Sequence, residues 1–299
     1  MDMLRIENLQ KCFGDKEVLR GLCLSVPEHS VYGFIGKNGA GKTTTMKAVL
    51  GLLKSDAGEI FVNGEKVVYG QTATNRYIGY LPDVPEFYPF MTAKEYLRFC
   101  GEISGMKKSE NEQRCKELLE LVGLSEERHR IKGFSRGMKQ RLGIAQALLN
   151  RPKLLICDEP TSALDPVGRK EILDILLSVR EQTTVLFSTH ILSDVERICT
   201  DIAFLNDGKI GVQGKLSDVK TKYRTEQYQL ETERDEDIPV LRNVFPAMKQ
   251  SGKNKIVFCG KDYNMADILR FLADKRISIL KLERMEPTLE SLFMEVAGK

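Results

Sequence analysis

The sequence predicts an α/β fold, in which short buried strands alternate with amphipathic helices. An apolar strand, Val31–Ile35, runs into the glycine-rich segment Gly36–Thr43, and a helix follows. The apolar face of that helix is formed at helical spacing by Met46, Val49, Leu50 and Leu53. Two later apolar strands, Leu154–Cys157 and Val185–Phe187, also run into polar segments and helices. This alternation is typical of a sheet covered by helices.

Length and composition narrow the class of protein. A chain of 299 residues suggests about two domains, and 42% hydrophobic with 29% charged residues is a globular composition. The net charge of only +3 argues against a dedicated nucleic-acid binder. The seven cysteines form no C-x-x-C pair, so we expect buried thiols in a reducing compartment, without disulfides or a metal site.

The N-terminal region predicts an antiparallel sheet. Two strands, Leu4–Gln10 and Val18–Val26, flank a turn at Gly14-Asp15. A hairpin follows the first helix, with strands Glu59–Val62 and Lys66–Val68 around Asn63-Gly64. Asn-Gly is a strong hairpin signal because both residues tolerate the left-handed backbone that such turns require.

A helical insertion is predicted over residues 85–150, after a strand at Tyr77–Leu81. Thr92 with Glu95, and Ser109 with Glu112, both fit the capping box of a helix start. The last helix of the insertion has Ser135 as its N-cap and is stopped by Arg151-Pro152.

The chain after residue 150 is predicted to alternate strands and helices as far as Leu216. Asp165 and Pro166 suit the start of a helix, Ser193-Asp194-Val195-Glu196 that of a shorter one, and a hairpin turns at Asp207-Gly208. Beyond Leu216 we expect a small α/β domain without a catalytic cluster. Its predicted strands are Tyr228–Glu231, Lys255–Cys259 and Ile277–Glu283, and its helices are Pro239–Phe245, Met265–Ala273 and Pro287–Val296.

Phosphate binding is predicted at the glycine-rich segment, which reads Gly36-Lys37-Asn38-Gly39-Ala40-Gly41-Lys42-Thr43 and fits G-x-x-x-x-G-K-[ST]. The glycines let backbone N–H groups turn toward an anion, and the helix start adds partial positive charge. Lys42 is expected to reach the β- and γ-phosphates, and the Thr43 hydroxyl to bind Mg²⁺. The strand before the segment and the helix after it favour this interpretation over a glycine-rich turn without chemical function.

Three polar residues follow buried strands and are candidates for hydrolytic chemistry. Asp158 is expected to hold Mg²⁺, and Glu159 to accept a proton from attacking water. His190 follows Val185–Phe187, where it would contact the γ-phosphate and Glu159. The alternatives are an acidic pair that begins a solvated turn and a histidine that merely lies at a strand end.

Two further segments are candidate nucleotide contacts. Ser135 and Gly137 begin a helix with free N–H groups, a ready anion site that a second copy of the chain could supply. Phe13, just before the first turn, could stack on adenine or could simply close a small sheet.

Together these residues resemble the ATP-binding-cassette (ABC) ATPase family over about residues 1–215. Gly36–Thr43 is similar to Walker A, Leu154–Glu159 to Walker B with the catalytic base, and Ser162–Asp165 to the D-loop. His190 is similar to the switch histidine, Phe13 to the A-loop aromatic, and Phe134–Met138 to the signature. The resemblance implies a P-loop NTPase (RecA-like) core at residues 1–216, with an antiparallel β subdomain and the helical insertion. Residues 217–299 would be an accessory α/β domain.

The resemblance also implies the ligands and the residues that contact them. ATP and Mg²⁺ are the expected cofactors. Nucleotide contacts would come from Phe13, Gly36, Asn38, Gly39, Ala40, Gly41, Lys42, Thr43 and Thr44. A second protomer would contribute Ser135, Arg136 and Gly137, and the D-loop would contribute Asp165. The metal would be held by Thr43 and Asp158.

Two departures from the family pattern bear on the nucleotide response. The signature has Arg136 in place of a glycine and Met138 in place of a glutamine. Asp83 stands where the family has the Q-loop glutamine. An aspartate offers Mg²⁺ an oxygen but adds negative charge near the γ-phosphate, so its role as a metal ligand stays open.

Gly79–Asp83, Phe134–Arg141 and the trailing α/β domain together resemble a subgroup of bacterial exporter ATPases, whose permease is a separate membrane chain. Members serve bacitracin, lantibiotics, drugs or sodium. The resemblance implies an ATP-bound homodimer at the cytoplasmic face of the cell membrane that energises a permease and binds no nucleic acid. The aromatic loop Phe87–Met91 would dock the permease or pack the insertion onto the core. The alternative function is an ABC ATPase that acts apart from transport.

Overall fold

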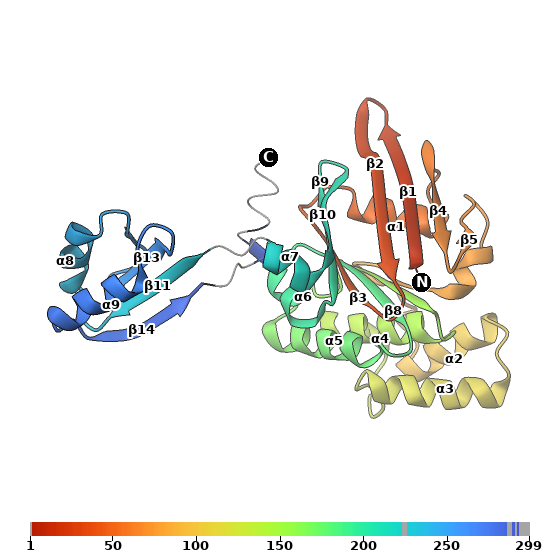
Figure 1. The fold of residues 1–299 in the computed structure, drawn as a ribbon. Coiled ribbons are helices and arrows are strands. Elements are labelled where there is room, and N and C mark those ends of the chain that lie inside the picture. The colour runs from red at the N-terminus through yellow and green to blue at the C-terminus, as the bar shows by residue number, and fades with distance from the viewer. Residues whose placement is uncertain (1, 223–225, 286–288, 291, 293–299) are drawn as a thin grey trace. The chain divides into compact units, whose positions relative to one another are not determined.

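The computed structural model describes residues 2–222, 226–285, 289, 290 and 292 (Figure 1). The chain divides into two compact units between Ser217 and Asp218. Each unit has its own hydrophobic core, and each is described by itself.

The first unit contains a four-stranded antiparallel sheet, in the order β2-β1-β4-β5. Its strands are β1 (Asp2–Phe13), β2 (Lys16–Pro27), β4 (Ala57–Val62) and β5 (Glu65–Lys66). Both predicted hairpins are confirmed, although β1 and β2 are longer and β5 shorter than expected. Asn63 and Gly64 have φ of 49° and 78°, the left-handed pair that an Asn-Gly turn requires.

A six-stranded sheet forms the centre of this unit, in the order β10-β9-β3-β8-β7-β6. Its strands are β3 (Val31–Gly36), β6 (Ile78–Leu81), β7 (Leu154–Asp158), β8 (Thr184–Thr189), β9 (Asp201–Asn206) and β10 (Lys209–Lys215). β6, β7, β8, β3 and β9 run parallel, and only β10 is antiparallel to its neighbour. Every residue of β3, β7 and β8 is buried, as in sheets covered on both faces. Because these three strands are parallel neighbours, the loops at their C-terminal ends meet at one edge.

Helices surround this sheet, and three of them form the insertion predicted over residues 85–150. The helices are α1 (Lys42–Val49), α2 (Ala93–Ile103), α3 (Lys108–Leu121), α4 (Arg136–Leu148), α5 (Pro166–Ser178), α6 (Leu192–Ile198) and α7 (Leu216–Lys222), with 3₁₀ turns at Ala73–Tyr77 and Ile131–Gly133. α4 contacts β6, and it also contacts α2 and α3, which lie beside it (Figure 1). The predicted caps of α2, α4 and α5 are confirmed: Thr92 forms a capping box with Glu95, Ser135 accepts from the Met138 N–H, and Asp165 accepts from the Gly168 N–H.

Three local predictions about these helices were wrong. Ser109 does not cap α3, which begins at Lys108, because Asn111 is buried and donates to the Arg98 carbonyl, which places position 109 inside the first turn. Ser193 does not cap α6, which begins at Leu192. The next residue, Asp194, is buried and accepts a hydrogen bond from the Thr161 hydroxyl at 2.7 Å. Leu53 lies beyond α1, which ends at Val49.

The expected burial of the cysteines holds only in part. Cys115, Cys157 and Cys199 are buried, whereas Cys12 and Cys23 are exposed. These two lie on β1 and β2, whose antiparallel sheet has one face in solvent.

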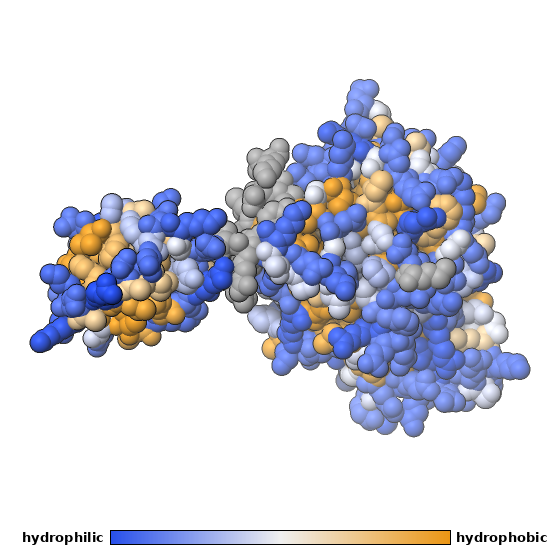
Figure 2. Space-filling model, viewed as in Figure 1, coloured by the Kyte–Doolittle hydropathy of each residue, from blue (hydrophilic) through white to orange (hydrophobic). Residues whose placement is uncertain are grey.

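The second unit begins within α7, and in its described residues a small antiparallel sheet packs against two further helices. Its strands, in the order β12-β13-β11-β14, are β11 (Gln227–Thr232), β12 (Lys249–Gln250), β13 (Lys255–Cys259) and β14 (Ile279–Arg284). α8 (Asp237–Val244) and α9 (Met265–Asp274) share its core with the sheet. The three predicted strands and the first two predicted helices are confirmed, the short β12 was missed, and most of the predicted helix Pro287–Val296 lies outside the described residues. Apolar side chains also reach its surface (Figure 2), among them Val240, Val244, Leu269 and Leu280.

Replacing Gly79 by alanine is expected to lower the free energy of unfolding of the first unit by roughly 3 kcal/mol, the upper end of overpacking penalties. A Cβ at Gly79 of β6 would lie 2.1 Å from the Ala147 carbonyl oxygen of α4, and no side-chain rotation relieves a clash with backbone. Gly133→Ala is the control, because a Cβ there meets no atom within 4 Å. Denaturant unfolding of both variants measures the difference, and equal stabilities would contradict this packing of β6 on α4.

Candidate active site

The loop between β3 and α1 has the backbone of an anion site. Gly39 and Gly41 have φ of 81° and 112°, a region that side chains rarely adopt. A Cβ on Gly41 would also approach the Leu19 Cδ2 atom to 2.8 Å. Gly41 is the N-cap residue of α1 and has no side chain that could accept a hydrogen bond from the first N–H groups of the helix. The first turn of α1 also carries no acidic residue. The N–H groups at this helix start are therefore available to a phosphate.

Lys42 places a buried positive charge beside that loop. Its Nζ atom donates to the Gly36 carbonyl at 2.6 Å and to the Lys37 carbonyl at 3.3 Å. The same atom lies 3.0 Å from Glu159 Oε1, and only 5% of the Lys42 side chain is exposed. The ammonium is thus held between the loop and the end of β7.

Asp158 and Thr43 bring oxygen atoms together at the start of α1. The Thr43 hydroxyl donates to Asp158 Oδ2 at 2.7 Å, and the Ser188 hydroxyl donates to Asp158 Oδ1 at 2.6 Å. Hydroxyl and carboxylate oxygens are the ligands that Mg²⁺ prefers, and it takes its other ligands from phosphate oxygens and water. The donor set therefore fits Mg²⁺, with Thr43 and Asp158 as the residues that would hold it.

Glu159 and His190 meet at the same edge of the sheet. His190 Nδ1 lies 2.9 Å from Glu159 Oε2, so that the carboxylate is bracketed by Lys42 on one oxygen and His190 on the other. Glu159 adopts a left-handed backbone with φ of 49°. Its N–H donates to the Ser188 carbonyl at 3.2 Å and to the Ser188 hydroxyl at 3.0 Å, which holds this conformation in place.

These residues line a common pocket of about 320 Å³, together with most of the predicted phosphate contacts. Its wall comprises Asn38, Gly39, Gly41, Lys42, Thr43, Thr44, Asp83, Asp158, Glu159, Ser162 and His190. Gly36 does not line it but accepts a hydrogen bond from Lys42. Ala40 lines a neighbouring hollow of about 720 Å³ with Lys16, Val18 and Gly39.

Phe13 is not among the lining residues of either hollow. Its side chain is half-exposed at the end of β1, and the Lys11 ammonium lies 5.4 Å from the centre of its ring.

The signature residues and the D-loop surround a different hollow. Ser135, Arg136, Gly137, Leu164 and Asp165 line a space of about 380 Å³. Within one chain, Ser135 and Gly137 are thus separate from the phosphate pocket, as the sequence suggested.

Asp83 lies on the wall of the phosphate pocket and contacts the signature helix. Its carboxylate is 3.2 Å from Arg136 Nη2, and its carbonyl accepts from the buried Gln140 side chain at 2.6 Å. Burial is the main cause that raises the pKa of Asp83. The positive charge of Arg136 lowers this pKa, and the negative charges of Asp158 and Glu159 raise it further.

Sequence reasoning missed three residues that shape the site. Ser188 bonds both Asp158 and the Glu159 backbone, and Ser162 lines the pocket. Thr161 is tied to Asp194, which joins the loop after β7 to α6. The available signal was position alone: Thr161 and Ser162 follow Glu159 closely, and Ser188 stands two residues before His190.

The aromatic loop packs on α2 and also reaches solvent. The Phe87 ring lies 5.1 Å from the Tyr96 ring, and the Tyr88 ring lies 5.7 Å from the Phe99 ring. Tyr88 and Phe90 nevertheless remain 49% and 61% exposed. The loop therefore packs the insertion and also presents apolar surface.

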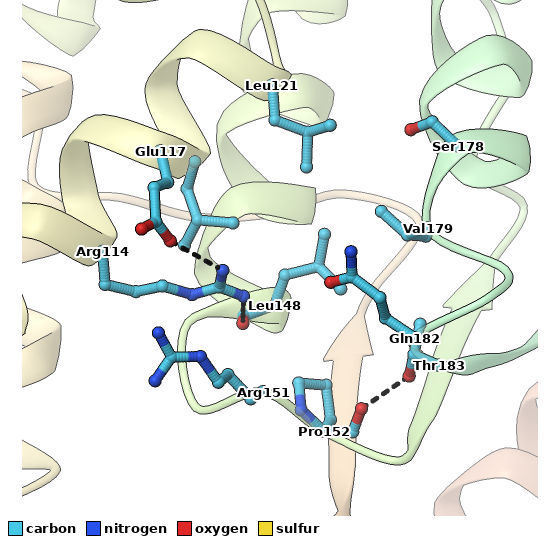
Figure 3. A pocket seen from close by; sticks show the side chains of 11 residues that line it. Arg114, Glu117, Leu121, Leu148, Arg151, Pro152, Ser178, Val179, Gln182 and Thr183 are labelled. Carbon is cyan, nitrogen blue, oxygen red and sulfur yellow. Dashed lines mark hydrogen bonds and ion pairs between the residues drawn. The ribbon is translucent and has the colours of Figure 1, made fainter.

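A further hollow of about 450 Å³ lies between α3, the end of α4 and the end of α5 (Figure 3). Arg114 on its wall donates to the Leu148 and Leu149 carbonyls, which lack partners within α4 because they end that helix. None of the residues predicted for the nucleotide site lines it. The position of Arg114 is accounted for by this helix end.

A phosphate loop, a strand-end aspartate on its threonine and a glutamate beside a histidine define a P-loop nucleotide-binding protein of the NTPase class. Residues 19–162 match the ABC transporter family, and residues 214–297 match the C-terminal domain of DrrA1-3-like ATP-binding proteins. The chain belongs to the family of ABC transporter ATP-binding proteins, whose domains bind nucleotide and are ATPases that work with membrane permease components.

Relatives match along nearly the whole chain. An uncharacterised ABC transporter ATP-binding protein of Bacillus subtilis, YxlF, is 39% identical over 98% of this chain and 99% of its own length. The bacitracin transport ATP-binding protein BcrA of Bacillus licheniformis is 33% identical, covering 99% and 97%. The linearmycin resistance ATP-binding protein LnrL of Bacillus subtilis is 31% identical, covering 99% of each chain.

Solved structures agree with the fold of the first unit. The ATP-binding subunit of an ABC transporter is 32% identical, with a TM-score of 0.66 over 74% of this chain and 93% of that one. The ADP conformation of the cassette MJ1267 is 26% identical, with a TM-score of 0.66 over 73% and 92%. In the part of the chain that the structure describes, no helix has the length and apolarity needed to cross a bilayer.

Proposed function

We propose that this chain is the ATP-hydrolysing subunit of a bacterial ABC exporter and that it energises a separate membrane permease from the cytoplasmic face. Residues 1–216 would be the ATPase and residues 217–299 an accessory domain. The observation that carries the hydrolytic part is the Glu159 carboxylate, which lies between the Lys42 ammonium and the His190 ring on the pocket wall. The likeness to bacitracin and linearmycin ATP-binding proteins supports the exporter part.

In the proposed reaction the phosphate loop positions the substrate. N–H groups at the start of α1 and the Lys42 ammonium would bind the β- and γ-phosphates, because charge-assisted hydrogen bonds favour developing negative charge. Mg²⁺, held by Thr43 and Asp158, would supply charge neutralisation between the phosphates. These residues orient the γ-phosphate toward the end of β7.

Glu159 would then act as the general base. Its carboxylate takes the proton of the attacking water, and His190, hydrogen-bonded to that carboxylate at 2.9 Å, orients it and reaches the γ-phosphate. The direct contact between Lys42 and Glu159 must be exchanged for contacts with the phosphates. ATP binding thereby releases the carboxylate for proton transfer.

A second copy of the chain would complete the pocket. Ser135 and Gly137 begin α4 but line a different hollow from the phosphate loop of their own chain. The Ser135 hydroxyl is already the N-cap of α4, and the first turn of that helix has no acidic residue, so this helix start can accept a phosphate. In the proposed homodimer, each ATP lies between one phosphate loop and the partner's Ser135 and Gly137, with Asp165 in the intervening D-loop.

The permease would dock on the aromatic loop. Replacing Phe87 and Tyr88 together by alanine is expected to weaken co-purification of the permease at least tenfold, because apolar rings at an interface carry much of its binding energy. The permease to use is first identified as a neighbouring reading frame that encodes about six apolar spans. A Leu52→Ala variant is the control, since Leu52 is 64% exposed but lies outside the insertion.

The same experiment separates docking from packing. Thermal melting and basal ATP hydrolysis of the double variant show whether the rings are needed for the fold. Loss of permease with both properties retained supports docking. Full recovery of the permease, or loss that follows unfolding, would contradict it.

A further inference from the structure

The two departures from the family pattern contact each other. Asp83, on the wall of the phosphate pocket, pairs with Arg136, the first residue of α4, at 3.2 Å. The two positions are 53 residues apart in sequence. We propose that Arg136 is the counter-charge of Asp83, a positioning residue that keeps this carboxylate from opposing nucleotide binding in its own chain. This inference rests on the proposed function.

The phosphate pocket contains several negative side chains whose charge must be compensated before a nucleotide can bind. Asp83, Asp158 and Glu159 all line it, and ATP brings further negative charge. Glu159 is paired with Lys42, and Asp158 accepts hydrogen bonds from Thr43 and Ser188. The Arg136 guanidinium likewise compensates the charge of Asp83. The glutamine that the family has at this position would need no such partner because it is neutral.

The backbone holds the two groups within reach of each other. The buried Gln140 side chain, one turn after Arg136 on α4, donates to the Asp83 carbonyl at 2.6 Å. The strand and loop around Asp83 also pack closely on this helix: a Cβ added to Gly143 would lie 2.5 Å from Leu81 and 3.3 Å from Pro85. The pocket wall and the start of the signature helix are therefore one packed assembly.

The exposure of the Asp83–Arg136 pair decides whether its effect should be sought in folding stability or in nucleotide affinity. The Arg136 and Asp83 side chains are 43% and 46% exposed, and exposed ion pairs add little to folding stability. An uncompensated charge several ångströms from a polyphosphate still acts on the ligand. The pair is therefore expected to change nucleotide affinity with little effect on the melting temperature.

The test measures affinity for a β,γ-imido analogue of ATP with Mg²⁺ by calorimetry, at a chain concentration where sedimentation shows a monomer. Arg136→Ala should raise the Kd about fivefold, the order of magnitude for one added charge at this range. Arg136→Lys should stay within twofold of the unmodified chain because it keeps the charge. Asp83→Asn combined with Arg136→Ala should also return the Kd to within twofold.

The control removes a matched arginine elsewhere. Arg5 pairs with Glu7 at 3.1 Å with both side chains about half-exposed, so Arg5→Ala should leave the Kd unchanged. An unchanged Kd in Arg136→Ala overturns the proposal. So does a weakening that persists after Asp83→Asn, since Arg136 would then act on the nucleotide itself. Absence of ATP hydrolysis by the unmodified chain, with these affinities still ordered as expected, would contradict only the proposed function.

Discussion

Replacing Glu159 by glutamine is expected to reduce ATP hydrolysis by about 10²- to 10⁴-fold, the usual contribution of a general base, while ATP still binds. The amide keeps the shape of the side chain and can still contact His190, but it cannot accept a proton from water. It also loses the charge that pairs with Lys42 at 3.0 Å, so the ammonium is freer to meet the phosphates. Phosphate release under saturating ATP measures the first effect and calorimetry the second.

The same variant should accumulate as a dimer with bound ATP, because the step that reopens the pair is blocked. Sedimentation with and without ATP detects this. Glu181→Gln is the control, since Glu181 is exposed in the turn between α5 and β8. Hydrolysis near that of the unmodified chain would remove Glu159 as the base, and a strictly monomeric ATP complex would contradict the shared pocket.

Replacing Lys42 by alanine is expected to weaken ATP binding by at least about 100-fold and to abolish measurable hydrolysis. Hydrogen bonds to charged groups contribute roughly 1.5–3 kcal/mol each, and Lys42 is placed to make more than one to the phosphates. The variant also leaves the Glu159 carboxylate without its cation inside the pocket. Direct titration with Mg²⁺ and ATP gives the affinity.

Lys47→Ala is the matched control, because Lys47 lies on the same helix with its side chain exposed. Its removal should leave the affinity within twofold. Thermal melting without nucleotide shows whether Lys42→Ala still folds. A folded variant that binds ATP as tightly as the unmodified chain would contradict the assignment of Lys42 to the phosphates.

Most of the fold was predictable because its signals are local. The buried runs at β3, β7 and β8 are continuous, and Asn63-Gly64 and Asp207-Gly208 mark the turns of two hairpins. Among the predictions that failed were the caps at Ser109 and Ser193. At both, a neighbouring residue, Asn111 or Asp194, is taken up by a partner distant in sequence, and a local pattern does not reveal such partners.

The site shows the same division. The phosphate loop, Asp158, Glu159 and His190 could be found because each stands directly after an apolar strand, and parallel strands bring such ends together. The role of Ser188 could not, because it depends on which strand neighbours β7. Asp83 and Arg136 each stood out alone, but their contact depends on how the loop after β6 packs on α4.

The left-handed backbone of Glu159 has a consequence for turnover. A conformation of this kind costs about 1–3 kcal/mol and persists only where the surroundings impose it. Here the neighbouring strand imposes it through two acceptors on Ser188, before any nucleotide arrives. The direction of the Cα–Cβ bond of Glu159 is thus fixed during folding, and in the proposed reaction each cycle would begin with this side chain already directed toward the pocket.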